Sequence, residues 1–314
     1  MRKLFRRLLR ITCWSLPLLF LGTWFVVDHV LPYTPVKPYR HTGDSLEWLA
    51  KQGVRPEDFA LHSRLLHIRT RDSLDLQALV VPIEKAPGQD SILSTLIVLH
   101  GITGCKEMFL PFAKELSAHG IQAVLPDLRA HGKSGGEYCT YGFYEKHDIS
   151  ALIDTLLSQN PRQRIGIYGN SLGGAVALQA LAEDKRLKFG VIESTFHDLE
   201  AVSCEYGEDL TGIKSRWLAH HVLEKSAIIA HFDPFSVQPG ESARLVTQPV
   251  FMAHGDCDDK IPFAFGRINF DHLASSDKNW YTVHGGGHLN IRAVGGVAYD
   301  SALWAFLARN CTSK

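Results

Sequence analysis

The chain has 314 residues, of which 45% are hydrophobic and 21% charged, with 33 basic and 33 acidic side chains. This composition excludes intrinsic disorder, collagen-like chains and small disulfide-rich proteins, and the zero net charge argues against a nucleic-acid partner. The balance hides one asymmetry, because five of the basic residues lie within positions 1–10. We therefore expect a globular protein with a cationic N-terminus.

An uncharged apolar segment follows these basic residues. It covers residues 11–27 and is followed by Asp28. Its length is at the short end of the range that a membrane-spanning helix needs. Trp14 and Trp24 are placed to anchor its ends at the interfaces. A cleaved signal peptide is the alternative, but large residues stand where cleavage requires small ones. The sequence thus predicts a transmembrane signal anchor.

The basic residues also predict an orientation. Positively charged flanks stay in the cytoplasm, so the body is expected on the periplasmic, lumenal or extracellular side of a single-pass membrane protein. Residues 28–60 are expected to form a linker and N-terminal extension. Within it, residues 31–38 hold three prolines in eight positions, which is typical of a stiff, extended spacer.

The cysteines give no sign of a metal site. There are six, without a CxxC pair or a zinc-type Cys/His spacing, so we expect no metal. Cys13 lies in the apolar segment. For the other five cysteines the sequence allows two alternatives, isolated buried thiols or one or two disulfides. These others are Cys105, Cys139, Cys204, Cys257 and Cys311.

From residue 61 onward, apolar runs alternate with stretches of helical periodicity. This alternation predicts an α/β domain over 61–314, with a mostly parallel eight-stranded sheet and helices on both faces. Strands are expected at Leu65–Arg69, Leu74–Val81, Thr95–Leu99, Gln122–Leu125, Ile165–Tyr168, Gly190–Glu193, Val250–Ala253 and Trp280–Val283. Helices are expected at Leu110–Ala118, Tyr144–Ser158, Leu172–Glu183, Phe263–Ala274 and Val297–Ala308. The first two strands lack a helix between them, so a hairpin with mixed strand directions is expected there.

The interval between the sixth and seventh strands is too long for a simple connector. Residues 212–230 within it have helical spacing of apolar side chains. We expect a small helical cap over one edge of the sheet, at about 196–248.

A candidate nucleophile lies between the fifth strand and the helix after it. Gly169-Asn170-Ser171-Leu172-Gly173 fits the pattern G-x-S-x-G in the strand, turn, helix context that this motif requires. The turn presents the serine Oγ, which needs a base and a third group to orient that base. Candidates follow the last two strands, namely Asp256, Asp258 and Asp259 and then His284 and His288.

Together these motifs resemble the α/β-hydrolase superfamily, whose triad runs Ser, acid, His along the chain. The resemblance covers roughly residues 61–307 and is to the serine-aminopeptidase-like and prolyl-oligopeptidase-like branches. The family pattern H-G-x-x-D-x-x-[IV]-P selects Asp258 as the acid. The sequence Gly287-His288-Leu289-Asn290 resembles the family's base motif and favours His288, with His284 as a minor alternative.

The resemblance also implies an oxyanion hole and a structural turn. After the third strand, Leu99-His100-Gly101-Ile102 resembles the family's H-G turn, so the hole is expected from the backbone N–H groups of Ile102 and Leu172. The run 127–134 resembles the D-x-R-G-H-G-x-S turn, with Ala130 replacing the usual glycine. This turn is expected to shape the floor of the site without joining the chemistry.

The implied activity is a membrane-anchored serine hydrolase that cleaves carboxylic esters, acyl lipids or thioesters, without a cofactor. A small-molecule or lipid acyl compound is the expected substrate. A serine peptidase, an acyltransferase on the same triad, and a catalytically silent anchored binding protein remain as alternatives. Fold-level analogy does not choose among them.

Overall fold

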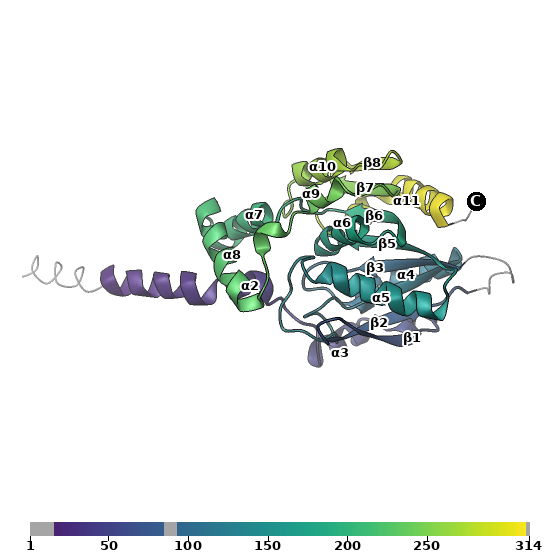
Figure 1. Ribbon diagram of the computed structural model, residues 1–314, viewed down its shortest axis with the longest axis horizontal. Helices are drawn as coiled ribbons and strands as arrows, with labels where there is room; N and C mark the ends of the chain where they lie inside the picture. The colour runs from purple at the N-terminus through teal and green to yellow at the C-terminus, as the bar shows by residue number, and fades with distance from the viewer. Residues whose placement is uncertain (1–15, 85–92, 312–314) are drawn as a thin grey trace, which may run out of the picture.

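The computed structural model describes residues 16–84 and 93–311, which include one eight-stranded sheet in the order β1-β2-β4-β3-β5-β6-β7-β8 (Figure 1). All eight expected strands are present. They are β1 (Arg64–Arg69), β2 (Asp75–Val81), β3 (Ser94–Leu99), β4 (Ile121–Pro126), β5 (Arg164–Asn170), β6 (Leu187–Glu193), β7 (Val250–Gly255) and β8 (Lys278–Val283).

The strand directions are mixed only at the start of the sheet. β2 runs antiparallel to both β1 and β4. All the remaining neighbouring pairs, from β4 across the sheet to β8, are parallel. The central strand β3 is buried along its whole length, which explains its continuous apolar sequence. The carboxyl ends of the parallel strands therefore meet at one end of the sheet.

Helices cover both faces of the sheet and enclose two apolar cores. One core includes side chains from α5 (Glu145–Gln159) and α6 (Leu172–Glu183), and the other includes side chains from α4 (Leu110–Ala118) and α11 (Ile291–Cys311). α10 (Phe263–His272) was also expected. α11 begins before the predicted Val297, with a kink at Gly296, where φ is 53°. Helical segments that the sequence did not predict are α3 (Asp44–Lys51), α9 (Pro239–Ala243), η2 (Pro56–Phe59), η3 (Lys106–Phe109) and η4 (Pro234–Ser236).

The cap between β6 and β7 is a helical hairpin. It contains α7 (Leu199–Thr211) and α8 (Arg216–Ala230), and only the second was expected. Asp198 and Ser215 cap the two N-termini by accepting hydrogen bonds from backbone N–H groups. In Figure 1 the hairpin lies at one end of the sheet, beside the N-terminal helix.

The expectation of an extended spacer over 31–38 is wrong. Residues 16–25 form an α-helix that continues through η1 (Val26–Val30), with π-helical bonding, and a turn into α2 (Tyr33–Val36). Packing explains the helical conformation, because Val36 is fully buried and α2 contacts α8. Residues 11–15 of the predicted anchor lie outside the described residues.

The N-terminal helix extends away from the body of the protein (Figure 1). Among the described helices, Leu16–Val36 is the one that is long and apolar enough to cross a membrane. A signal sequence meets the same criterion, so the helix has the character of an anchor or a signal sequence.

The open question about the cysteines is settled for the described part of the chain. Cys105, Cys139, Cys204, Cys257 and Cys311 are all free thiols, and Cys13 lies outside the described residues.

Candidate active site

Ser171 occupies a strained turn between β5 and α6. Its φ of 53° and ψ of −122° lie in a region that residues with a side chain rarely adopt. The turn is tight because strand and helix nearly touch. A Cβ on Gly169 would lie 2.1 Å from the carbonyl oxygen of Gly173, and one on Gly173 would lie 2.5 Å from that of Leu99. The two glycines of the motif are therefore steric requirements.

Neighbouring strands fix this turn in place. The N–H of Ser171 donates to the carbonyl of Glu193 at 2.9 Å, and Thr195 Oγ1 donates to the carbonyl of Ser171 at 2.8 Å. Ser171 is only 4% exposed, so it is less accessible than the motif alone suggests.

His288 connects Ser171 to Asp258. His288 Nε2 lies 3.0 Å from Ser171 Oγ, and His288 Nδ1 lies 2.9 Å from Asp258 Oδ2. The hydrogen-bond network assigns the proton to Nδ1, which donates to the carboxylate, so Nε2 accepts from the serine hydroxyl. The side chains of His288 and Asp258 are 10% and 0% exposed. The structure therefore brings together the three residues that the motif spacing selected.

The carboxylate of Asp258 is held by its own loop and by a second imidazole. It accepts hydrogen bonds from the backbone N–H groups of Lys260 and Ile261, at 3.0 and 2.9 Å. His254 Nε2 lies 3.2 Å from it and 3.0 Å from the carbonyl of Ile261. Burial by itself would raise the pKa of Asp258, but hydrogen bonds from His254 and His288 lower it below its usual value. The acid is therefore ionised over the neutral range.

The other candidate pair, Asp256 and His284, is separate from Ser171. Asp256 Oδ2 lies 2.8 Å from His284 Nδ1, and Asp256 also accepts a hydrogen bond from the backbone N–H of Gly285. The His284 side chain is 86% exposed. Asp259 is 75% exposed and lies 3.8 Å from Lys260. These acids shape the surface of the loop.

The loop after β3 passes close to the nucleophile. A Cβ on Gly101 would lie 3.4 Å from the Cβ of Ser171. Within the described part of the chain, no hydrogen-bond acceptor is recorded for the backbone N–H of Ile102 or of Leu172. Two donors with no protein acceptor among the described residues thus belong to segments that adjoin Ser171.

His100 fixes the shape of this loop. Its Nδ1 donates to the carbonyl of Gly101 at 2.8 Å, and its Nε2 accepts from the N–H of Leu128 at 3.1 Å. Burial lowers the pKa of His100 to about 3, so the ring stays neutral and keeps both roles.

The turn over 127–134 is a hydrogen-bonding hub below the site. Buried Asp127 accepts from the backbone N–H and Nζ of Lys106, at 2.8 and 2.6 Å, and from the N–H of Lys133 at 2.8 Å. Ala130 has a φ of 61°, a conformation that glycine adopts more easily. The residues described contain no cluster of three or more His, Cys, Asp or Glu side chains placed to hold a metal ion.

Sequence reasoning missed two residues near the triad. His254 makes the second contact to Asp258, and its four-residue spacing from that acid in the H-G-x-x-D motif was an available signal. Tyr206, from α7, has a side chain that interacts with that of Ser171. No motif pointed to Tyr206, because α7 itself was not predicted.

The sheet order and a serine on a strained turn after β5, with acid and histidine after β7 and β8, define an α/β-hydrolase fold. A family model described as "alpha/beta hydrolase fold" matches residues 94–203. The fold and this match support membership of the α/β-hydrolase superfamily.

Individual proteins are similar to this chain in sequence or in fold. YqkD of Bacillus subtilis is 29% identical over 180 residues, which are 54% of this chain and 56% of YqkD, so the chain matches about half of that relative. The putative esterase YitV of the same organism is 26% identical over 62% of this chain and 79% of its own length. The structure of the Pyrococcus furiosus esterase Pf2001 superimposes with a TM-score of 0.69 at 24% identity, covering 88% of this chain and 98% of that one.

Proposed function

We propose that the protein is a membrane-anchored serine hydrolase that cleaves carboxylic esters through an acyl-enzyme. In this proposal Ser171 is the nucleophile, His288 the general base and Asp258 the acid that orients the base. The observation that carries it is the continuous contact from Ser171 Oγ through His288 to the buried, ionised Asp258. A serine hydroxyl becomes a useful nucleophile near neutral pH only with such a base.

Each step of the proposed reaction uses a group already in position. Ser171 Oγ attacks the ester carbonyl carbon while its proton passes to His288 Nε2. The bond from that carbon to the alcohol oxygen then breaks, and His288 returns the proton to the leaving alcohol. Water attacks the acyl-Ser171 ester in the same way, releases the carboxylic acid and restores the serine.

The oxyanion formed in each step needs donors that are already oriented. The backbone N–H groups of Ile102 and Leu172 suit this role, since neither has a recorded protein acceptor in the described residues. His100, whose two hydrogen bonds fix the loop that carries Ile102, positions that donor. The esterase names of YitV and Pf2001 favour an ester as substrate.

Labelling with a fluorophosphonate probe tests the proposal. The wild-type protein is expected to react covalently, and Ser171→Ala is expected to lose all labelling. Ser203→Ala is the matched control, because Ser203 lines the neighbouring pocket but makes no hydrogen bond to a histidine within the part of the chain that the structure describes. Labelling that persists in Ser171→Ala would exclude Ser171 as the nucleophile.

Membrane attachment has its own test. The helix Leu16–Val36 and the basic residues before it support an anchor with a cytoplasmic N-terminus. The body is then expected to stay in the membrane fraction after carbonate washing and to resist protease added to vesicles whose cytoplasmic face is outward. Release of the body by carbonate would indicate cleavage or peripheral attachment.

A further inference from the structure

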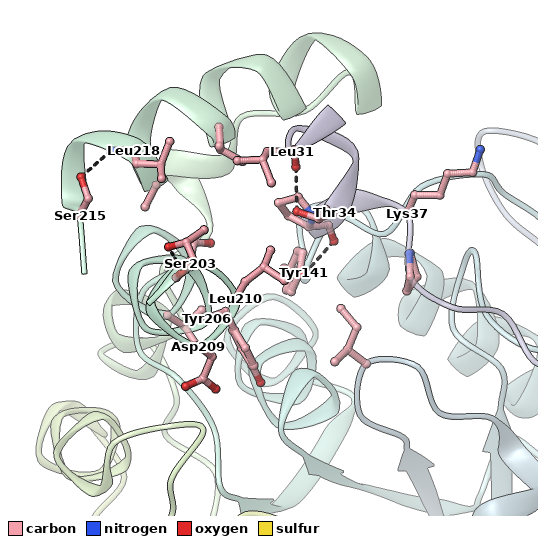
Figure 2. Close-up of a pocket in the computed structure, with 18 of the residues that line it drawn as sticks. Leu31, Thr34, Lys37, Tyr141, Ser203, Tyr206, Asp209, Leu210, Ser215 and Leu218 are labelled. Carbon is pink, nitrogen blue, oxygen red and sulfur yellow. Dashed lines mark hydrogen bonds between the residues drawn. The ribbon is translucent and has the colours of Figure 1, made fainter. Parts of the chain in front are cut away.

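A pocket lies between the cap hairpin and the segment that follows the N-terminal helix (Figure 2). We call it the cap pocket, with walls from α7, α8, residues 31–39 and the loop after β3. Its volume of about 460 Å³ is within the range of about 300–1,000 Å³ that is usual for small-molecule sites. Most of its walls are apolar, and Leu31, Pro35, Val202 and Val222 are examples.

The inner end of the cap pocket is lined by two residues that adjoin the candidate nucleophile. One is Ile102, the expected oxyanion-hole residue, and the other is Tyr206, whose side chain interacts with that of Ser171. A molecule that fills the pocket therefore contacts residues next to Ser171.

The outer end of the cap pocket is exposed and apolar. Leu210 and Ile213 line the pocket and are also 65% and 62% exposed, so they form its rim at the turn between α7 and α8. Trp217, at the start of α8, is 73% exposed. Exposed apolar side chains grouped beside an apolar helix are typical of a surface that meets a membrane.

The cap pocket offers no free charge among its described lining residues. Its charged members, Lys37 and Asp209, already pair with Glu137 at 3.3 Å and with Lys260 at 2.8 Å. A charged or strongly polar ligand would find no partner there, whereas a hydrocarbon chain would gain from burial.

The N-terminal wall of the pocket is fastened to the rest of the protein. Asp28 pairs with His221 at 2.7 Å and with Lys225 at 3.0 Å, both on α8. Ser226 Oγ donates to the carbonyl of Pro32 at 2.7 Å, and Tyr141 Oη donates to that of Pro35 at 2.8 Å. The end of the apolar helix is thus a fixed part of the pocket.

We propose that the cap pocket binds the acyl chain of a membrane-lipid ester, which enters from the bilayer at the rim formed by Leu210 and Ile213. The chain lies along residues 31–35, and its carbonyl carbon reaches Ser171. This inference rests on the proposed ester hydrolysis, and it adds the substrate class and the route of entry. It also makes the N-terminal helix part of the substrate site.

Gly207 allows the pocket to be filled with little disturbance. It lies on α7 and lines the pocket, and a Cβ there would meet no atom within 4 Å. Wild-type kcat/KM for p-nitrophenyl esters is expected to rise about fourfold for each methylene buried. Gly207→Phe is expected to lower kcat/KM at least about tenfold more for the dodecanoate ester than for the acetate ester. Ile228→Phe is the control, because Ile228 is 71% exposed on α8 but does not line the pocket, and its effects on the two esters should be equal.

Binding separates this inference from the proposed function. In the Ser171→Ala background, binding of the uncharged p-nitrophenyl dodecanoate ester is expected in calorimetry, and adding Gly207→Phe should weaken it about tenfold. Binding that depends on Gly207 without any ester turnover would overturn the hydrolase proposal alone. Ester turnover with equal effects of Gly207→Phe on short and long chains would overturn the acyl pocket alone.

The route of entry is tested with esters embedded in phosphatidylcholine vesicles. Ile213→Glu is expected to slow hydrolysis of an embedded long-chain ester about tenfold more than that of soluble p-nitrophenyl butyrate, which does not have to leave a bilayer. Ile228→Glu is the control, because Ile228 is 71% exposed on α8 but does not line the pocket. Equal effects of the two substitutions would overturn entry at the rim.

Discussion

The triad loops and the cap pocket hold their residues in different ways. The loops after β5, β7 and β8 place Ser171, Asp258 and His288 at 4%, 0% and 10% exposure, in a chain of hydrogen bonds. The rim of the cap pocket has large apolar side chains that are mostly exposed. Its link to the acid loop is the ion pair of Lys260 with Asp209, whose side chains are 44% and 45% exposed.

This difference indicates that the triad loops and the cap pocket have separate roles. Bond-making chemistry requires reacting groups held to within a fraction of an ångström, and buried hydrogen bonds between strand ends provide that rigidity. The rim of the cap, which is exposed and joined to the acid loop by an exposed ion pair, can change in sequence with little effect on the triad. Under the proposed function, the loops determine which bond is cleaved and the cap determines which acyl chain is accepted.

Loss of the nucleophile is the most severe way to break the triad loops. Ser171→Ala is expected to reduce kcat for ester hydrolysis by about a million-fold, the size of a nucleophile loss in a serine protease. The fold should persist, because one hydroxyl is removed and the backbone of Ser171 keeps its hydrogen bonds to the carbonyl of Glu193 and to Thr195 Oγ1. Steady-state kinetics and a thermal melt measure the two effects. Retention of more than about a tenth of the wild-type rate would contradict the triad.

The acids of the loop after β7 provide a matched pair. Asp258→Asn is expected to lower kcat about ten-thousand-fold, because an amide favours the wrong tautomer of His288. Asp256→Asn should be mild, since within the described residues the Asp256 side chain contacts the exposed His284, Gly285 and its own loop, and not His288. Kinetics of the two variants on one ester test the assignment. A severe loss of kcat in Asp256→Asn and a mild loss in Asp258→Asn would mean that the triad acid had been assigned two residues too late in the loop.

How much the sequence predicts differs between the two regions for a physical reason. The triad loops are governed by local requirements, such as the close approach at Gly169 and Gly173, which leave a readable motif. The helical course of residues 31–36 depends on packing against α8, and the proline pattern alone suggested an extended chain. α7 and Tyr206 likewise depend on tertiary contacts. Local rules indicated Ser171 and α8, and the family motifs selected Asp258 and His288, whereas long-range packing determines α7 and the course of residues 31–36.

The next prediction concerns the contact between Val36, at the end of α2, and the body of the protein. Val36 is fully buried, and its carbonyl accepts from the N–H of Cys139 at 2.8 Å. Val36→Ala is expected to lower the free energy of unfolding by about 2 kcal/mol, through lost apolar contacts and the resulting cavity. Val30→Ala is the control, because Val30 is 46% exposed, and a change of about 0.5 kcal/mol or less is expected. Equal effects in denaturant titrations would mean that the segment is not docked.

The last prediction concerns the effect of acid on stability through His100, in the loop after β3. Burial, helped by neighbouring His131, lowers the pKa of His100 to about 3, whereas the unfolded value is near 6.5. Below about pH 6.5 the unfolded chain binds a proton that the folded protein does not, so this residue's contribution is complete above that pH and lost as the pH falls toward about 3. The loss is about 1.4 kcal/mol for each pH unit.

His100→Gln removes this titration, while an amide can still donate to Gly101 and accept from Leu128. The pKa of buried His131 is also lowered, so the wild-type protein keeps a second acid-sensitive histidine in either case. The comparison is therefore the difference in slope between wild type and His100→Gln, from urea titrations between about pH 6 and about pH 4.5. The free energy of unfolding of His100→Gln is expected to change with pH less steeply than that of the wild type, by about 1.4 kcal/mol per pH unit. Equal slopes would mean that folding does not lower the pKa of His100.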